Sequence, residues 1–256
     1  MTTHSRNAAT RAGGLARALL LPRFCPLCGR PLSLGSVDGA SLQADGSGLL
    51  PFPEAQDLLC DSCLLLLRPY AGERCQKCGK ELISESGICM RCRNREWSFE
   101  EAFPIFAYDG AAAELVAAYK FAGRRSLARF LAGILSRALM ENWPGRPIVP
   151  VPYRRAKIVE KGWDQVEEIV RVLDRRGFEV RRILERLPSG EQKRLSQEGR
   201  LENARKAYRL VPGAAVPDEV VLVDDVLTTG ATAEACARAL REGGARRVAV
   251  LALAAD

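Results

Sequence analysis

Eight of the nine cysteines in this 256-residue chain fall into four pairs, and two residues separate the members of every pair. The pairs are Cys25 and Cys28, Cys60 and Cys63, Cys75 and Cys78, and Cys89 and Cys92. This spacing lets both thiolates of a pair bind one metal ion, and two pairs complete a tetrahedral all-thiolate zinc site. Because such a site leaves no coordination position open, the cysteines predict two structural Zn2+ ions within residues 22–96.

The order of the pairs along the chain favours a sequential grouping. Cys25, Cys28, Cys60 and Cys63 would then bind one zinc, and Cys75, Cys78, Cys89 and Cys92 would bind the other. The long spacer between the first two pairs leaves a crossed grouping open. Free thiols and a redox dithiol are the alternative interpretations. Four identical spacings argue against the first, and no pair lies in the strand and helix context of a thioredoxin-like motif.

The remaining composition narrows the compartment and the chemistry. Cysteines spaced for metal rather than for disulfides indicate a reducing compartment, so we expect a cytoplasmic protein. No apolar run approaches the ~20 residues of a membrane-spanning helix, and the stretch Leu15–Leu21 lacks the pattern of a signal peptide. His4 is the only histidine, which excludes histidine-based catalytic triads and histidine-rich metal sites.

Three zones follow one another along the chain. We expect residues 1–21 to be a tail and a short helix. Residues 22–96 hold the cysteine pairs, and residues 97–256 alternate apolar runs with amphipathic patterns. In the third zone we expect strands at 103–108, 147–152, 220–223 and 247–254, and helices at 111–119, 126–142 and 164–176. The last strand, helix and strand make a βαβ unit, which predicts an α/β domain with a parallel sheet.

A short polar segment follows the buried strand at 220–223. It comprises Asp224, Asp225, Thr228, Thr229, Gly230, Ala231 and Thr232. The backbone N–H groups and hydroxyls of residues 228–232 can surround a phosphate, and the positive end of the following helix favours the anion. The two carboxylates can accept hydrogen bonds from the hydroxyls of a ribose. An ordinary strand, loop and helix with capping threonines is the alternative interpretation.

This pattern resembles the signature of type I phosphoribosyltransferases. In those enzymes the acidic pair holds the ribose hydroxyls of phosphoribosyl pyrophosphate (PRPP), and the loop holds its 5′-phosphate. The resemblance implies a type I phosphoribosyltransferase-like parallel sheet with helices on both faces, and the cysteine pairs predict that a small double zinc-ribbon domain precedes it. It also implies PRPP as a ligand, with Mg2+ held mainly by the PRPP itself and by water.

Further segments are similar to the ComF family, in which a double zinc ribbon precedes such a domain. They are Val149–Arg155, Lys161–Gln165 and Gln192–Ser196, with Lys120 at a further family-like position. Trp163 and Asp164 stand where that family usually has Phe and Asn. The cations of these segments are candidates for binding the pyrophosphate and for a loop that closes over the ligand. They are Arg154, Arg155, Lys161, Lys193 and Arg194.

The resemblance leaves two functions open. A phosphoribosyltransferase would transfer the phosphoribosyl group to an acceptor, but no catalytic residue or acceptor site is identifiable in the sequence. ComF-like proteins are associated with DNA uptake in natural competence, which implies single-stranded DNA and the DNA-uptake machinery as partners. The net charge of +7 suits an anionic partner, but a solvated basic surface is the commoner explanation of such a charge. PRPP would then be only a regulatory ligand of a zinc-ribbon protein that binds nucleic acid.

Overall fold

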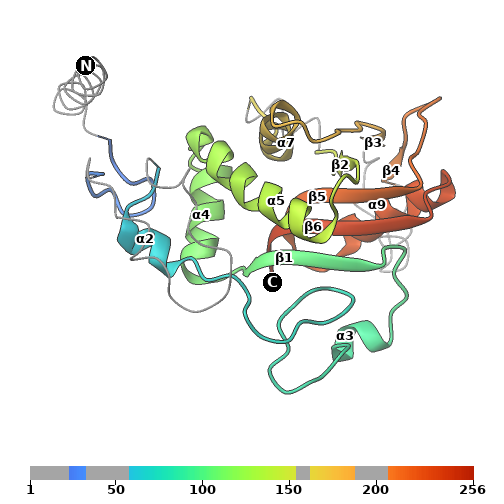
Figure 1. Cartoon of the computed structure of the whole chain (residues 1–256), viewed down its shortest axis with the longest axis horizontal. Coiled ribbons are helices and arrows are strands. Elements are labelled where there is room, and N and C mark those ends of the chain that lie inside the picture. Colours follow the sequence, from blue (N-terminus) through green and yellow to red (C-terminus); the bar gives the residue numbers. More distant parts are fainter. Residues whose placement is uncertain (1–22, 33–57, 154–161, 188–206) are drawn as a thin grey trace, which may run out of the picture.

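The computed structural model describes residues 23–32, 58–153, 162–187 and 207–256 (Figure 1). In chain order its elements are α2 (Asp61–Leu66), α3 (Met90–Arg93), β1 (Glu101–Ala107), α4 (Gly110–Lys120), the 3-10 turn η1 (Arg125–Leu127), α5 (Ala128–Asn142), β2 (Ile148–Pro150), α7 (Gln165–Arg175), β3 (Leu184–Arg186), β4 (Tyr208–Leu210), β5 (Glu219–Leu227), α9 (Ala231–Glu242) and β6 (Arg247–Ala255).

Four parallel strands form the main sheet in the order β1-β6-β5-β2. The two central strands, β5 and β6, are nearly continuous apolar runs, as expected for strands that are covered on both faces. Their register places Val221 opposite Ala249 and Val223 opposite Leu251. A separate antiparallel pair, β3 and β4, lies beyond the β2 edge and was not expected from the sequence.

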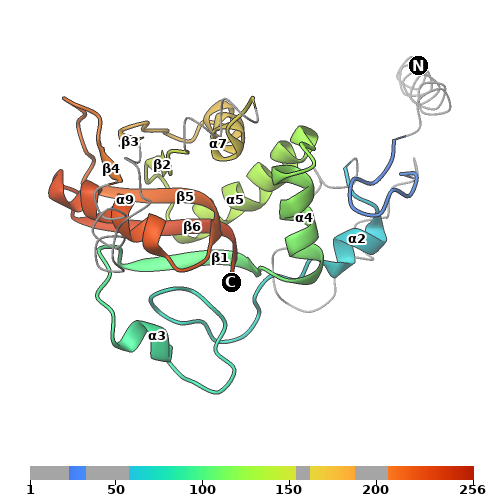
Figure 2. The ribbon, with the colours of Figure 1, turned by 180° about the vertical axis from the view of Figure 1, so that it is seen from behind.

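Helices cover both faces of the sheet. On one face, α4, α5 and α7 pack over Val221 and Val223 of β5. On the other face, α9 packs over Val220 and Leu222, because successive side chains of a strand point to opposite sides. Figure 1 shows α5 in front of the sheet, and Figure 2 brings α9 to the front. The expectation of a parallel α/β sheet with helices on both faces after two cysteine ribbons is confirmed.

Local sequence signals explain where several elements begin and end. The side chain of Asp164 accepts a hydrogen bond from the backbone N–H of Glu167 at 3.0 Å, which makes Asp164 the N-cap of α7. Gly177 follows that helix with φ of +91°. β5 continues four residues past the predicted end at Val223, so that Asp224 and Asp225 lie within the strand. The extension follows from the pairing of β5 with β6, because this pairing continues as far as Leu227 of β5, which lies opposite Ala255 of β6.

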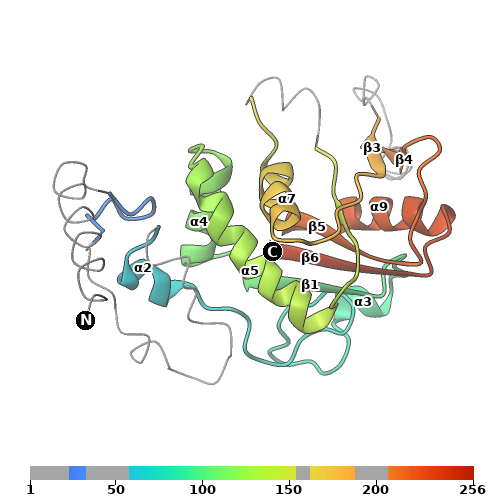
Figure 3. The same cartoon turned by 45° about the horizontal axis from the view of Figure 1, so that its top comes forward.

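The cysteine region folds into two similar knuckles. The backbone N–H groups of Gly29 and Gly79 bond the carbonyl oxygens of Cys25 and Cys75 at 2.8 and 2.9 Å. The first knuckle lies with α2 beside α4, and the second lies with α3 near β1 (Figure 3). Gly79 has φ of +68°, and a Cβ there would lie 2.1 Å from the carbonyl oxygen of Ala102. Only glycine therefore allows the second knuckle to pack this closely on β1.

None of the helices in the described ranges is both long and apolar enough to cross a membrane.

Candidate functional site

The loop between β5 and α9 lies at the carboxyl end of β5, one of the two central strands of the parallel sheet. Thr228 and Thr229 leave the strand, and Gly230 is the N-cap of α9 in a left-handed conformation with φ of +74°. The hydroxyl of Thr229 accepts a bond from the N–H of Ala231 at 3.3 Å. α9 begins one residue before the position near Thr232 expected from the sequence. Its positive end and the loop N–H groups make this edge suitable for an anion.

Asp225 is buried and paired with a lysine. Its Oδ2 lies 2.7 Å from Nζ of Lys120 at the end of α4, and only 6% of Asp225 is exposed. Burial alone would lower the pKa of Lys120, but the Asp225 carboxylate raises it above its ordinary value. The salt bridge fixes the Asp225 carboxylate next to the loop.

Asp224 lies on the opposite side of β5, where α9 and Tyr208 pack. Its Oδ1 accepts the backbone N–H of Asp225 at 2.9 Å. Burial raises the pKa of Asp224 to about 7, and the neighbouring Asp225 carboxylate acts in the same direction. The two carboxylates thus differ in their surroundings: Asp225 pairs with Lys120, whereas Asp224 lies on the other side of the strand with a raised pKa.

Lys120, named above as a further family-like position, belongs to this site. Its place is fixed by a buried link between α4 and α7. The hydroxyl of Tyr119 donates to the carbonyl oxygen of Gln165 at 2.7 Å, and Nε2 of Gln165 donates to the carbonyl oxygen of Lys120 at 3.4 Å. Gln165 is fully buried. The signal in the sequence was the family-like position of Lys120, which says nothing about its pairing with Asp225.

The five basic loop candidates lie outside the described residues. They are Arg154, Arg155, Lys161, Lys193 and Arg194. Among the described residues, the carboxyl end of β2 and the β3–β4 pair enclose a cavity of about 330 Å3. Tyr153, Asp164 and Arg186 are among the residues that line it.

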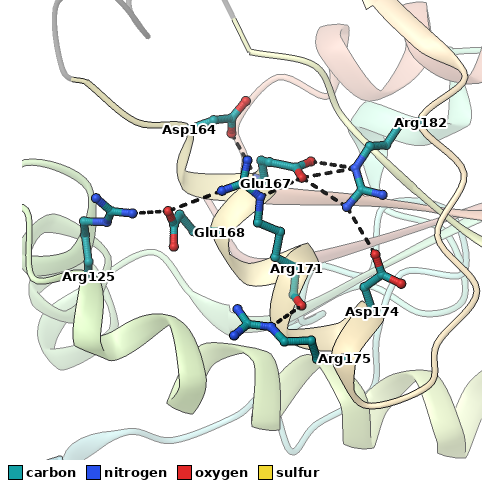
Figure 4. Close-up of polar contacts among 8 residues, drawn as sticks. All are labelled: Arg125, Asp164, Glu167, Glu168, Arg171, Asp174, Arg175 and Arg182. Carbon is teal, nitrogen blue, oxygen red and sulfur yellow. Dashed lines mark hydrogen bonds and ion pairs between the residues drawn. The ribbon is translucent and has the colours of Figure 1, made fainter.

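An ion-pair network on α7 connects that helix to its surroundings (Figure 4). Glu167 binds Arg171 at 3.2 Å and Arg182 at 3.1 Å, and Arg182 also reaches Asp174. Glu168 pairs with Arg125 of η1. Because these groups are largely at the surface, the network orients the start of α7 more than it stabilises the fold.

The eight paired cysteines form two clusters with the expected sequential grouping. One contains Cys25, Cys28, Cys60 and Cys63, and the other contains Cys75, Cys78, Cys89 and Cys92; within each, all sulfur atoms lie within 4.8 Å of one another. The remaining cysteine, Cys236, is buried in α9 among alanines. Since each cluster takes its two pairs in chain order, the crossed grouping does not occur.

The donor set of both clusters fits zinc. Tetrahedral coordination with Zn–S bonds near ~2.3 Å separates sulfur atoms by about 3.8 Å. The observed Sγ–Sγ distances are 3.5 Å between Cys28 and Cys60 and 3.8 Å between Cys78 and Cys89. Burial alone would raise the pKa of Cys75, but backbone N–H groups, that of Cys89 first, lower it to about 7. Both clusters could therefore hold a structural zinc ion.

Comparison with known proteins finds that competence proteins are similar to this chain. No family model matches it. Competence protein ComFC of Streptococcus pneumoniae is 28% identical over 211 residues, which cover 81% of this chain and 92% of that protein. Competence protein F of Haemophilus influenzae is 29% identical over 214 residues, which cover 78% and 91%. The chain is a relative of the ComF competence proteins. DNA utilization protein YhgH of Escherichia coli strain K12 is 25% identical over 248 residues, which cover 92% of this chain and 98% of that protein.

Solved structures similar to this ComF relative overlap with only about half of it. Glutamine PRPP amidotransferase from B. subtilis, complexed with ADP and GMP, has a TM-score of 0.32 and 21% identity, covering 51% of this chain and 26% of its own. A hypoxanthine phosphoribosyltransferase from Staphylococcus aureus has a TM-score of 0.31 and 13% identity, covering 50% and 62%. At these scores the overlap carries no argument about function.

Proposed function

We propose that this ComF relative binds PRPP with Mg2+ at the β5–α9 edge of a type I phosphoribosyltransferase-like domain, residues 97–256, which follows a double zinc-ribbon domain, residues 22–96. The observation that carries the proposal is the order of groups along β5 and its loop. Two adjacent carboxylates, of which Asp225 is buried and held by Lys120, come two residues before a loop that leads into the N-terminus of α9. This order matches a ligand whose ribose hydroxyls lie next to its phosphate.

Each part of PRPP has a proposed partner in this arrangement. Asp224 and Asp225 accept hydrogen bonds from the ribose hydroxyls, and residues 228–232 bind the 5′-phosphate through N–H groups and hydroxyls. Mg2+ is carried mainly by the diphosphate and water. The basic residues of 154–161 and 193–194 supply cations for the pyrophosphate. Transfer to an acceptor would break the bond between the ribose anomeric carbon and the pyrophosphate, which would leave with the bonding electron pair.

A variant comparison tests the site independently of the fold. We expect Asp224→Ala/Asp225→Ala to weaken PRPP binding at least about tenfold in calorimetry, because the ribose hydroxyls lose their acceptors. Asp218→Asn is the matched control, since Asp218 is an acidic residue just before β5. It pairs with Arg246 at the surface, where the side chain of Asp218 is 63% exposed and that of Arg246 is 76% exposed. Equal PRPP affinity in the double variant and the control would overturn the assignment of the acidic pair.

A role in DNA uptake, with single-stranded DNA as ligand, is the second candidate. Its support is the set of relatives named as competence and DNA utilization proteins, together with a basic groove beside the first cysteine cluster. Arg23, Arg124 and Arg129 line this groove of about 690 Å3, and Phe24 on its wall is 57% exposed. Cations beside an exposed aromatic ring are the groups that bind single-stranded nucleic acid.

The basic residues of the second ribbon give less support to DNA binding than their number suggests. Arg74 donates to the carbonyl oxygens of Pro104 and Tyr70, and Lys77 donates to that of Glu100. These side chains therefore hold the ribbon on β1. We expect salt-dependent binding of single-stranded DNA that Arg124→Ala/Arg129→Ala weakens and Asp224→Ala/Asp225→Ala does not. Absence of binding even at low salt would rule out the second candidate.

A further inference from the structure

The last cysteine pair of the second cluster and the segment that follows it lie directly against the proposed phosphate loop. The guanidinium of Arg91 donates to the carbonyl oxygen of Thr228 at 3.3 and 3.4 Å. That of Arg95 donates to the carbonyl oxygen of Thr229 at 3.3 Å. More than 130 residues separate each arginine from its partner in the sequence. Two consecutive carbonyl groups of one loop are thus bound by cations from a distant ribbon.

Trp97 packs on the glycine of the same loop. A Cβ at Gly230 would lie 2.8 Å from the indole ring, so the ring touches the backbone there. The guanidinium of Arg95 lies 4.0 Å from the centroid of the ring, and Phe99 packs against it at 4.8 Å between centroids. The cation–π contact holds Arg95 and Trp97 together as one unit beside the loop.

Ser98 fixes this segment to the first turn of α9. Its backbone N–H and its hydroxyl donate to the two carboxylate oxygens of Glu234 at 2.7 and 2.8 Å. These contacts reach the loop and its helix at every residue from Thr228 to Gly230 and at Glu234. We call the four residues that make them the ribbon clamp: Arg91, Arg95, Trp97 and Ser98.

The second cysteine cluster determines where the ribbon clamp lies. Arg91 stands between the ligands Cys89 and Cys92 in α3, a helix of only four residues. So short a helix has no stability of its own, and its position depends on the bonds that the cluster makes. Trp97 also packs against the apolar surface of this cluster. The four cysteines are all buried, in contrast to the first cluster, where Cys28 is exposed.

The contacts are on the carbonyl side of the loop peptides, which leaves their N–H groups directed away from the arginines. In a planar trans peptide, the carbonyl group of Thr228 and the N–H of Thr229 point in opposite directions, as do the carbonyl group of Thr229 and the N–H of Gly230. A cation on the carbonyl oxygen polarises the peptide and makes its N–H a stronger donor. The ribbon clamp thus strengthens and orders the donors that would face a phosphate.

We propose that metal binding by Cys75, Cys78, Cys89 and Cys92 sets the affinity of the loop at 228–230 for the 5′-phosphate, with Arg91 and Arg95 as positioning residues. The inference rests on the proposed PRPP site and adds a control by the second zinc. The first cluster, which packs on α4 and η1, takes no part in this control.

The first experiment changes the arginines and keeps both zinc ions. Arg91→Ala/Arg95→Ala should bind ribose 5-phosphate and PRPP about tenfold more weakly in calorimetry, by the same factor for both, because the affected group is the shared phosphate. Zinc content should stay at the wild-type value. Arg91→Lys/Arg95→Lys should recover part of the affinity, since an ammonium can donate to the same carbonyl oxygens. Arg93→Ala is the matched control, because Arg93 lies in α3 but bonds Ile88.

The second experiment removes one zinc ion at a time. Cys78→Ser and Cys28→Ser change the same position of the two knuckles, and each should cost one zinc per chain. We expect only Cys78→Ser to weaken binding of ribose 5-phosphate, to the level of the arginine variant. Wild-type affinity in Arg91→Ala/Arg95→Ala, or an equal loss in both cysteine variants, would overturn the control by the second zinc.

The result for the wild-type protein separates this inference from the proposed function. If wild-type protein with two zinc ions binds neither ribose 5-phosphate nor PRPP, the proposed function fails and the control by zinc fails with it. If wild-type protein binds both and the arginine variant binds them equally well, only the control by zinc fails. Should Cys78→Ser not fold, the arginine variants decide the question.

Discussion

Two adjacent aspartates differ because the strand points them to opposite sides of the sheet. Asp225 forms a salt bridge with Lys120, whereas Asp224 faces the α9 side, where burial raises its pKa to about 7. The sequence predicts both carboxylates but not this difference. The difference depends on Lys120, which is far from Asp225 in the sequence. Lys120 reaches Asp225 only because α4 packs on the sheet.

The raised pKa of Asp224 makes stability depend on pH. Its folded-state pKa of about 7 lies above the ordinary value of 3.8, so ionisation destabilises the folded state, and the associated stability is lost as pH rises through about 7. We expect Asp224→Asn to be more stable than wild type by roughly 2 kcal/mol at pH 8.5 and equal to it near pH 4. Urea unfolding at both pH values measures the difference. A constant difference across this range would contradict the raised pKa.

At the scale of elements, the apolar runs predict the strands and most helices, but not their lengths or neighbours. β5 extends to Leu227 because β6 pairs with it that far, and β1 lies beside β6 although they are far apart in the sequence. The three-residue strands β3 and β4 carry no alternation long enough to recognise. The ribbon clamp could not be predicted, because its arginines bind backbone carbonyl groups, which leave no mark on the sequence of the loop.

Gly230 joins two elements and tolerates no side chain for two separate reasons. Its φ of +74° strains any other residue, and a Cβ would meet Trp97 at 2.8 Å. We expect Gly230→Ala to lower the free energy of unfolding by about 2–4 kcal/mol, from backbone strain and overpacking together. Gly213→Ala is the control, because Gly213 has φ of +76° with no atom within 4 Å of its Cβ position. Equal losses in the two variants, measured by urea unfolding, would show that the contact with Trp97 is unimportant.

At the scale of the whole molecule, the cysteine clusters are joined to the α/β domain and do not form a separate appendage. Cys25 and Cys63 belong to the same apolar core as α4 and α5, and the second ribbon bonds β1 through Lys77 and Ala102. The cysteine spacing predicts the two clusters and their grouping. It does not predict their attachment, which depends on side chains from distant parts of the chain.

Zinc removal should therefore affect more than the ribbons. Each structural zinc contributes on the order of 10 kcal/mol to the folding of its own site. Because the first cluster shares a core with α4 and α5, a chelator should abolish the ordered ribbon and also lower the melting temperature of the α/β domain. Zinc content, near-ultraviolet circular dichroism and calorimetric melting measure the three effects. An unchanged melting temperature after loss of both ions would show that the domains fold independently.

The central claim is that the β5–α9 edge binds PRPP, and titration of the zinc-loaded wild-type protein with PRPP tests it most directly. The account predicts saturable binding of one PRPP per chain in calorimetry, tighter with Mg2+ than without it. Mg2+ should add affinity because it offsets the charge of the diphosphate. No heat of binding at millimolar PRPP, in protein that carries two zinc ions and melts cooperatively, would contradict the claim.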